Sequence, residues 1–173
     1  MLVKKKEKIS DKNGQINKQI KKLLFPTHTL SNFEILEYAN MIGLPIDCLA
    51  KNQVPKSIPK NTGLIVNLQD IGQSGSHWVC AIRKNNKCLY YDSFGITYIP
   101  KQLENCLIKS VGRENIYLSD GQNQYITSVL CGYYTLYMCK SILLDGMNFK
   151  QATDQFSDNP SMKNMDIADN LFI

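Results

Sequence analysis

The fold is decided by the stretch His77-Trp-Val-Cys-Ala-Ile-Arg-Lys-Asn-Asn-Lys-Cys-Leu-Tyr-Tyr-Asp92. Two runs rich in β-branched and aromatic residues, 77–82 and 87–92, flank the turn-forming pair Asn85-Asn86. This pattern is typical of two strands joined by a tight turn. We therefore predict an antiparallel hairpin at this position, and the rest of the chain is interpreted around it.

Helices are predicted on both sides of the hairpin in the sequence. Ser31, followed by Glu34, has the pattern of a capping box, and Gly43 would end the helix that begins there. The segment 131–144 is almost entirely apolar and long enough for a buried helix. Further predictions are strands at 63–68 and 116–118, a helix at 149–156, and an irregular segment that contains Pro45, Pro55 and Pro59. The order helix, strands, central helix indicates an α+β fold with helices on a mainly antiparallel sheet.

The composition is that of a globular protein, with 43% hydrophobic and 20% charged residues in a chain of 173. This length fits a single domain. No stretch approaches the roughly 20 apolar residues that span a bilayer, and the first lysines are not followed by the apolar region of a secretory signal. We therefore expect no membrane partner and no secretion, and a protein that acts inside a cell or a particle assembled there.

Positive charge is concentrated at the N-terminus. Residues 1–22 hold eight lysines against two acidic residues, a balance of +6 within a total of +5, so the remaining 151 residues sum to −1. We interpret 1–25 as a basic arm, partly disordered or helical over 15–24, and 26–173 as a single domain. Such an arm can bind DNA through counterion release, or it can be a solvated leader. The candidate DNA contacts are Lys4, Lys5, Lys6 and Lys8.

The cysteines give one candidate nucleophile. Six lie at positions 48, 80, 88, 106, 131 and 139. None forms a Cys-x-x-Cys pair, so we predict no zinc or other metal site, and a disulfide framework is not expected. Most should be buried core residues, but Cys131 falls where the irregular stretch 119–124 meets the apolar helix. A helix N-terminus and a nearby histidine favour the thiolate, and Gly132 would let a substrate approach the backbone.

Only two histidines are available to a Cys-His mechanism. His28 lies in a predicted loop with no carboxylate expected beside it. His77 begins a strand of the hairpin, and its partner depends on the turn. With the turn centred on Asn85-Asn86, Ile82 faces Leu89 and the same register sets Val79 opposite Asp92.

His77 and Asp92 then become diagonal neighbours on one face of the hairpin. The carboxylate would hold one imidazole nitrogen and leave the other free for a thiol. A turn of odd length would instead put the two side chains on opposite faces. In the alternative interpretation, Asp92 is an ordinary turn-forming residue.

An acyl-transfer site also needs hydrogen-bond donors for an oxyanion. The backbone N–H of Cys131, free at the helix start, is one candidate. Gln122 and Gln124 both lie in the preceding loop, and either could supply a side-chain amide. Both could equally be solvated loop residues.

Together these motifs resemble a known family. His77-Trp78, then Tyr91-Asp92-Ser93-Phe94-Gly95, then Gln124 seven residues before Cys131-Gly132, is similar to the adenovirus-type maturation proteinases (adenain-like), which also occur in virophages and Polinton/Maverick elements. The resemblance spans roughly residues 30–141 and includes Leu30-Ser-Asn and Gly75-Ser-His-Trp. The order His, acid, Gln, Cys is shared more distantly with SUMO-deconjugating proteases and is reversed relative to papain.

The resemblance implies a cysteine-protease fold whose central helix carries the nucleophile. By position, it implies that His77 is the general base, Asp92 the third member of the triad, Cys131 the nucleophile and Gln124, rather than Gln122, the oxyanion donor. It implies a peptidase domain over 26–173 that needs no cofactor, with DNA as a possible activator. The substrates would be viral capsid or penton precursors, cleaved at Gly-Gly or Gly-x-Gly type sites, in the virion and the host-cell cytoplasm (virus factory).

Two other functions stay open at this point. The same four residues would serve a protease that removes a ubiquitin-like protein from its conjugates. Alternatively, the basic arm would belong to a non-enzymatic protein associated with nucleic acid or with a capsid. In that case Cys131 would be an ordinary buried thiol.

Overall fold

The computed structural model describes residues 28–156 and 159–160. The basic arm 1–25, the helix expected over 15–24 and the four candidate DNA-contact lysines lie outside these residues. The elements, in chain order, are α2 (Asn32–Ile42), β1 (Ile46–Ala50), the 3₁₀ turn η1 (Lys51–Gln53), β2 (Thr62–Asn67), β3 (Trp78–Lys84), β4 (Lys87–Tyr91), α3 (Lys101–Val111), the 3₁₀ turn η2 (Arg113–Asn115), β5 (Ile116–Leu118), α4 (Cys131–Leu143) and α5 (Phe149–Thr153). The predicted α+β class is confirmed.

Five strands form one sheet in the order β1-β2-β3-β4-β5. The three central strands, β2, β3 and β4, run antiparallel to one another, as predicted. The two outer strands differ, because β1 pairs parallel to β2 and β5 pairs parallel to β4. The sheet is therefore mixed, with an antiparallel centre that contains the predicted hairpin.

The hairpin has the predicted register. Ile82 pairs with Leu89, and Lys84 pairs with Lys87 across a two-residue turn. Asn85 adopts φ 56° in this turn, a left-handed conformation that asparagine tolerates better than most residues. The ladder between β3 and β4 ends with the pair Cys80 and Tyr91, so the residues before β3 and after β4 lie side by side at the end of the hairpin.

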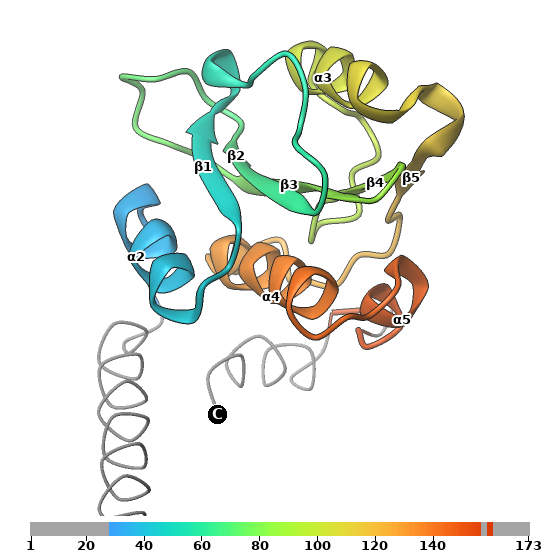
Figure 1. Cartoon of the computed structure of the whole chain (residues 1–173). Coiled ribbons are helices and arrows are strands. Elements are labelled where there is room, and N and C mark those ends of the chain that lie inside the picture. Colours follow the sequence, from blue (N-terminus) through green and yellow to red (C-terminus); the bar gives the residue numbers. More distant parts are fainter. Residues whose placement is uncertain (1–27, 157–158, 161–173) are drawn as a thin grey trace, which may run out of the picture.

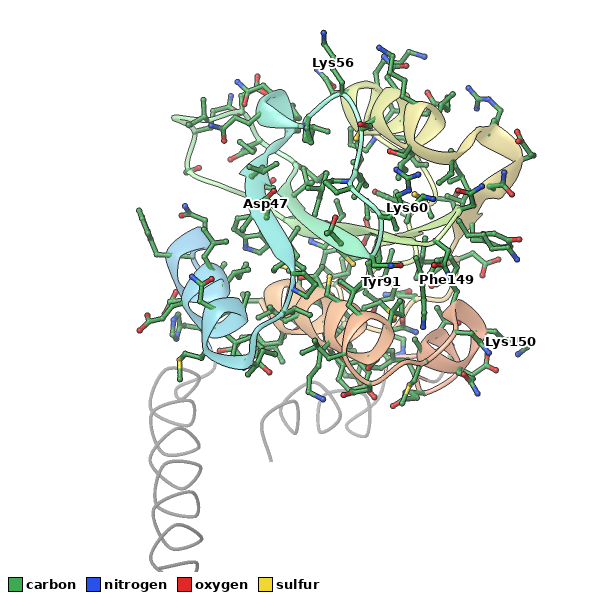
Figure 2. All side chains as sticks on the ribbon, in the orientation of Figure 1. Asp47, Lys56, Lys60, Tyr91, Phe149 and Lys150 are labelled. Atoms are coloured by element: carbon green, nitrogen blue, oxygen red, sulfur yellow. The ribbon has the colours of Figure 1, made fainter. Side chains whose placement is uncertain are left out.

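Helices cover both faces of the sheet (Figure 1). On one face, α4 lies along the sheet and packs with α2 and α5 around a core that includes Tyr38, Tyr134 and Phe156. On the other face, α3 and the segment around Ile58 enclose a second core. Side chains fill the space on both sides of the strands, and Tyr91 lies between the sheet and α4 (Figure 2). The central helix is thus buried by sheet and helices, as its apolar sequence predicts.

Two elements differ from the sequence interpretation. β1 begins directly after Pro45 and therefore lies within the segment that was expected to be irregular. It is a strand because its backbone pairs with the buried strand β2. α3 was not predicted. Its buried residues, Leu103, Cys106, Leu107 and Ser110, recur at helical spacing, so the sequence did carry a signal for this helix.

Candidate active site

Three elements bring the predicted site residues together. His77 directly precedes β3 and Asp92 directly follows β4, so both lie at the end of the hairpin away from its turn. Cys131 is the first residue of α4. This helix packs against the sheet, and Cys131 belongs to the core between them. Gln124 lies in the loop between β5 and α4. All four side chains are buried, and His77 and Cys131 retain exposed fractions of 8% and 4%.

His77 and Asp92 form a short, buried contact. The Nε2 atom of His77 lies 2.8 Å from Oδ1 of Asp92. The same carboxylate oxygen accepts the backbone N–H of Phe94 at 2.8 Å. The ring of Phe94 stacks on the imidazole with its centroid 4.5 Å away and the planes 22° apart. The imidazole is therefore held at one nitrogen by a carboxylate and across its plane by an aromatic ring.

Cys131 also interacts with the imidazole of His77. Burial alone would lower the pKa of His77, but the hydrogen bonds and negative charges of Asp92 and Cys131 together raise this pKa to about 9. Nε2 is occupied by Asp92, whereas the buried Nδ1 has no partner at hydrogen-bond distance and angle among the residues that the structure describes. Nδ1 is thus the nitrogen left for the thiol, whose sulfur sits at the positive end of α4. A thiol and an imidazole placed in this way are the two groups that a Cys-His mechanism requires.

Gln124 is fixed within its loop. Its backbone N–H donates to the carbonyl oxygen of Ser93 at 2.9 Å. Its side-chain Oε1 accepts the Ser93 hydroxyl at 2.5 Å, and its Nε2 donates to the carbonyl of Ser128 at 2.9 Å. Gln122, the alternative amide, is half-buried and donates to the backbone carbonyl of Gln124. Of the two glutamines, Gln124 therefore has the buried and oriented amide.

Two expectations about nearby residues need correction. Gly132 does not leave room for a substrate, because a Cβ there would lie 3.1 Å from Cβ of Leu30. Its small size instead allows Leu30 to pack on α4, while the Leu30 carbonyl accepts the indole N–H of Trp78 at 2.9 Å. His28 does have a carboxylate partner, since its Nε2 lies 2.6 Å from Oε1 of Glu34. The capping box at the start of α2 turns this carboxylate back toward the loop.

A groove of about 420 Å³ adjoins the site. It runs between the start of α2 and the loop 69–76, and its lining includes Ser76 and Trp78, which flank His77 in sequence. Leu30 contributes to the same wall. The remaining lining residues are Thr29, Ser31, Asn32, Cys48, Leu49, Ala50, Gln53, Asn67, Gln69, Asp70, Ile71, Gly72, Gln73, Ser74 and Gly75. The groove is therefore mixed in polarity and reaches the two residues next to His77 in sequence, while the four candidate site residues themselves are not among its lining.

The cysteines have the environment expected of reduced thiols. All six are free and buried, and burial raises the pKa of Cys48 and of Cys88 to about 12. Within the described part of the chain, no group of three or more His, Cys, Asp or Glu side chains is arranged to hold a metal ion. In that same part, none of the helices has the length and apolar character required to cross a membrane.

Sequence reasoning missed two residues at this site. Ser93 and Phe94 both lie in the motif that follows β4, yet neither was given a part in the site. Ser93 contacts Gln124, and Phe94 covers the imidazole. The sequence did offer one signal for both residues, because they directly follow Asp92. Residues in the same tight turn lie close to one another in space.

The fold is that of a known cysteine protease. The chain is similar to the crystal structure of the ASFV pS273R protease, with a TM-score of 0.51 and 15% sequence identity over 85% of this chain and 69% of that one. No protein-family model matches the sequence, and no curated protein matches it either. The likeness therefore lies in the arrangement of helices and strands, and it is a likeness to the fold of a cysteine protease.

Proposed function

We propose that this chain is a cysteine endopeptidase in which Cys131 is the nucleophile, His77 the acid and base, and Asp92 the residue that orients His77. The observation that carries the proposal is the buried 2.8 Å contact between His77 Nε2 and Asp92 Oδ1, with Cys131 at the start of α4 interacting with the same imidazole. An imidazole between a buried carboxylate and a thiol at a helix start is the arrangement that activates a cysteine. The likeness to a viral cysteine protease fold supports it.

The reaction follows from the positions of these groups. The Cys131 thiolate attacks the scissile carbonyl carbon, and the carbonyl oxygen becomes an oxyanion that the Cys131 backbone N–H and the Gln124 amide stabilise. Nδ1–H of His77 then gives its proton to the leaving amine, and a thioester remains. Water attacks this thioester while His77 takes the water proton, which releases the acyl product and restores the thiolate. Asp92 keeps Nε2 protonated and the ring in one orientation throughout.

The adjoining groove supports an extended peptide as the substrate. It is lined by the start of α2 and by both sequence neighbours of His77, so a peptide lying in it would pass close to His77. Bound in this way, several residues on one side of the scissile bond would contact the protein. Contacts of this kind give an endopeptidase its sequence preference.

The proposal extends to the biological role. By its resemblance to the adenovirus-type enzymes, we propose that the natural substrates are capsid or penton precursors cleaved at Gly-Gly or Gly-x-Gly sites. The enzyme would act in the virion and the virus factory of the host cytoplasm. The eight lysines of residues 1–22 would bind DNA, which would place enzyme and packaged substrate on the same polymer.

The test is peptide hydrolysis by the full chain and by Cys131→Ala, each with and without DNA. A library of extended peptides with Gly-Gly or Gly-x-Gly sites is compared with ubiquitin-like proteins fused through a C-terminal Gly-Gly. We expect cleavage of the peptides by the wild type and none by Cys131→Ala. Cleavage confined to the folded fusions would identify a deconjugating protease instead, and equal turnover by Cys131→Ala would refute the thiol mechanism.

A further inference from the structure

The turn that follows β4 contacts the site at two places. Its first residue, Asp92, holds His77, and its second, Ser93, holds Gln124 through both the side chain and the main chain. Ser93 and Gln124 are each completely buried. We propose that Ser93 is a positioning residue that fixes the direction in which the Gln124 amide points. The inference rests on the proposed function, because it assigns Ser93 a part in stabilising the oxyanion.

The two ends of an amide side chain differ in what they can do. Only the NH₂ end can donate to an oxyanion, and a half-turn about the last side-chain bond would replace it with the carbonyl oxygen. In the structure the Ser93 hydroxyl donates to Oε1 at 2.5 Å, and the Ser128 carbonyl accepts from Nε2 at 2.9 Å. The two contacts select one orientation, because the Ser128 carbonyl oxygen can only accept and the Ser93 hydroxyl then donates to Oε1. One hydrogen of Nε2 is thereby left for a substrate oxyanion.

Backbone hydrogen bonds also join the turn after β4 to the loop that carries Gln124. The carbonyl oxygen of Ser93 accepts the backbone N–H groups of Asn123 and Gln124, both at 2.9 Å. Two residues on, Gly95 has φ 75°, and a Cβ there would lie 2.9 Å from both Asp120 O and Gln122 N. The turn and the loop that carries Gln124 therefore pack backbone against backbone. Asp92, which orients the base, and Ser93, which orients the oxyanion donor, are thus consecutive residues.

Loss of the Ser93 hydroxyl has a specific chemical consequence. Oε1 of Gln124 becomes a buried acceptor without a donor, which destabilises this orientation of the side chain. Nε2 then no longer points consistently toward the reacting carbonyl. Since the oxyanion exists only after the thiolate has attacked, binding of the uncleaved peptide is unaffected. The loss appears in kcat and not in KM.

The experiment compares Ser93→Ala and Ser93→Thr in the full chain. Removing a whole oxyanion donor lowers kcat about 100- to 1000-fold. Ser93→Ala keeps the Gln124 amide but no longer fixes its direction, so we expect it to lower kcat roughly tenfold or more. We expect KM to change less than about twofold and Ser93→Thr, which keeps a hydroxyl, to recover part of the loss. In a Gln124→Ala background, Ser93→Ala should have almost no further effect, because the two residues act through one group.

A matched control comes from the opposite face of the sheet. Ser110 in α3 is also buried, donates to Cys106 O at 2.7 Å and accepts the N–H of Ile58 at 2.8 Å. Ser110→Ala should lower the thermal midpoint as Ser93→Ala does while leaving kcat unchanged. A peptide aldehyde, which forms a tetrahedral adduct with the thiol, should bind roughly tenfold more weakly to Ser93→Ala than to the wild type. The cleaved product peptide should bind both equally.

The outcomes separate this inference from the proposed function. An active wild type whose Ser93→Ala variant keeps kcat and aldehyde affinity within twofold overturns the role of Ser93 and leaves the peptidase intact. Equal losses in Ser93→Ala alone and in the Gln124→Ala background overturn it as well, because the effect would then be general destabilisation. A wild type without Cys131-dependent turnover overturns the proposed function, and with it this inference.

Discussion

Replacing Asp92 with asparagine removes a charge while keeping the shape of the side chain. The N–H of Phe94 requires an acceptor at the Oδ1 position, 2.8 Å away, so the asparagine carbonyl should occupy that position and its NH₂ the place of Oδ2. The carbonyl can still accept from Nε2 of His77. The imidazole therefore keeps its orientation and its tautomer, and the variant isolates the electrostatic effect of the carboxylate on the proton of His77.

The magnitude follows from the pKa of His77. This pKa is raised to about 9, and Asp92 and Cys131 share the increase. A neighbouring carboxylate shifts such a group by about one unit or more, which corresponds to about 1.4 kcal/mol. Because His77 must be protonated to release the amine, wild-type kcat/KM should fall as the pH rises through about 9. In Asp92→Asn the pKa of His77 is lower, so this decline should begin at least about one pH unit earlier.

The assay is the pH profile of kcat/KM for one peptide, measured from pH 6 to pH 10 for the wild type, Asp92→Asn and Asp92→Ala. With a shift of one unit, Asp92→Asn should be reduced roughly fivefold more at pH 9 than at pH 7. Asp92→Ala removes the acceptor of Phe94 as well and releases the imidazole, so it should be less active than Asp92→Asn at every pH. An unchanged alkaline decline in Asp92→Asn would refute the role of the carboxylate in holding the proton on His77.

Three further predictions use the same peptide assay. Cys131→Ala and His77→Ala should each abolish turnover without a large loss of thermal stability, and residual cleavage close to the wild-type rate would exclude either residue from the reaction. Gln124→Ala should reduce kcat on the order of a hundredfold or more, whereas the neighbouring Gln122→Ala should reduce it by less than about threefold; equal losses would leave the oxyanion donor unassigned. Lysine-to-glutamate changes across residues 4–8 should remove binding to DNA in an electrophoretic shift assay and leave DNA-free hydrolysis intact, and unaltered DNA affinity would show that the arm is not the contact.

The hairpin could be predicted from the sequence because one short feature determines its register. A two-residue Asn-Asn turn leaves a single in-register pairing of the apolar runs, and this pairing brings the residues before and after the hairpin together. The start of α4 was equally readable, since a polar stretch meets a long apolar run at Cys131. The contact between His77 and Asp92 and the helix position of Cys131 therefore follow from local rules of strands and helices.

The parts that could not be predicted depend on distant partners. β1 is a strand because β2 offers it backbone hydrogen bonds, and nothing within Ile46–Ala50 specifies that neighbour. Gly132 was expected to face substrate, but Leu30, which lies about a hundred residues earlier in the chain, occupies the space beside it. The contact between Ser93 and Gln124 likewise joins two loops. Such pairings arise from packing in three dimensions, and no spacing in the sequence encodes them.

The measurement that tests the central claim most directly is the alkylation of individual cysteines by iodoacetamide at pH 7, followed by peptide mapping of the folded protein. All six thiols are buried, but only Cys131 lies beside an imidazole that stays protonated at this pH. We predict that Cys131 alone reacts rapidly and that His77→Ala slows its alkylation at least about tenfold. If Cys131 reacts no faster than Cys80 and Cys139, or at the same rate without His77, the thiol is not activated and the account is contradicted.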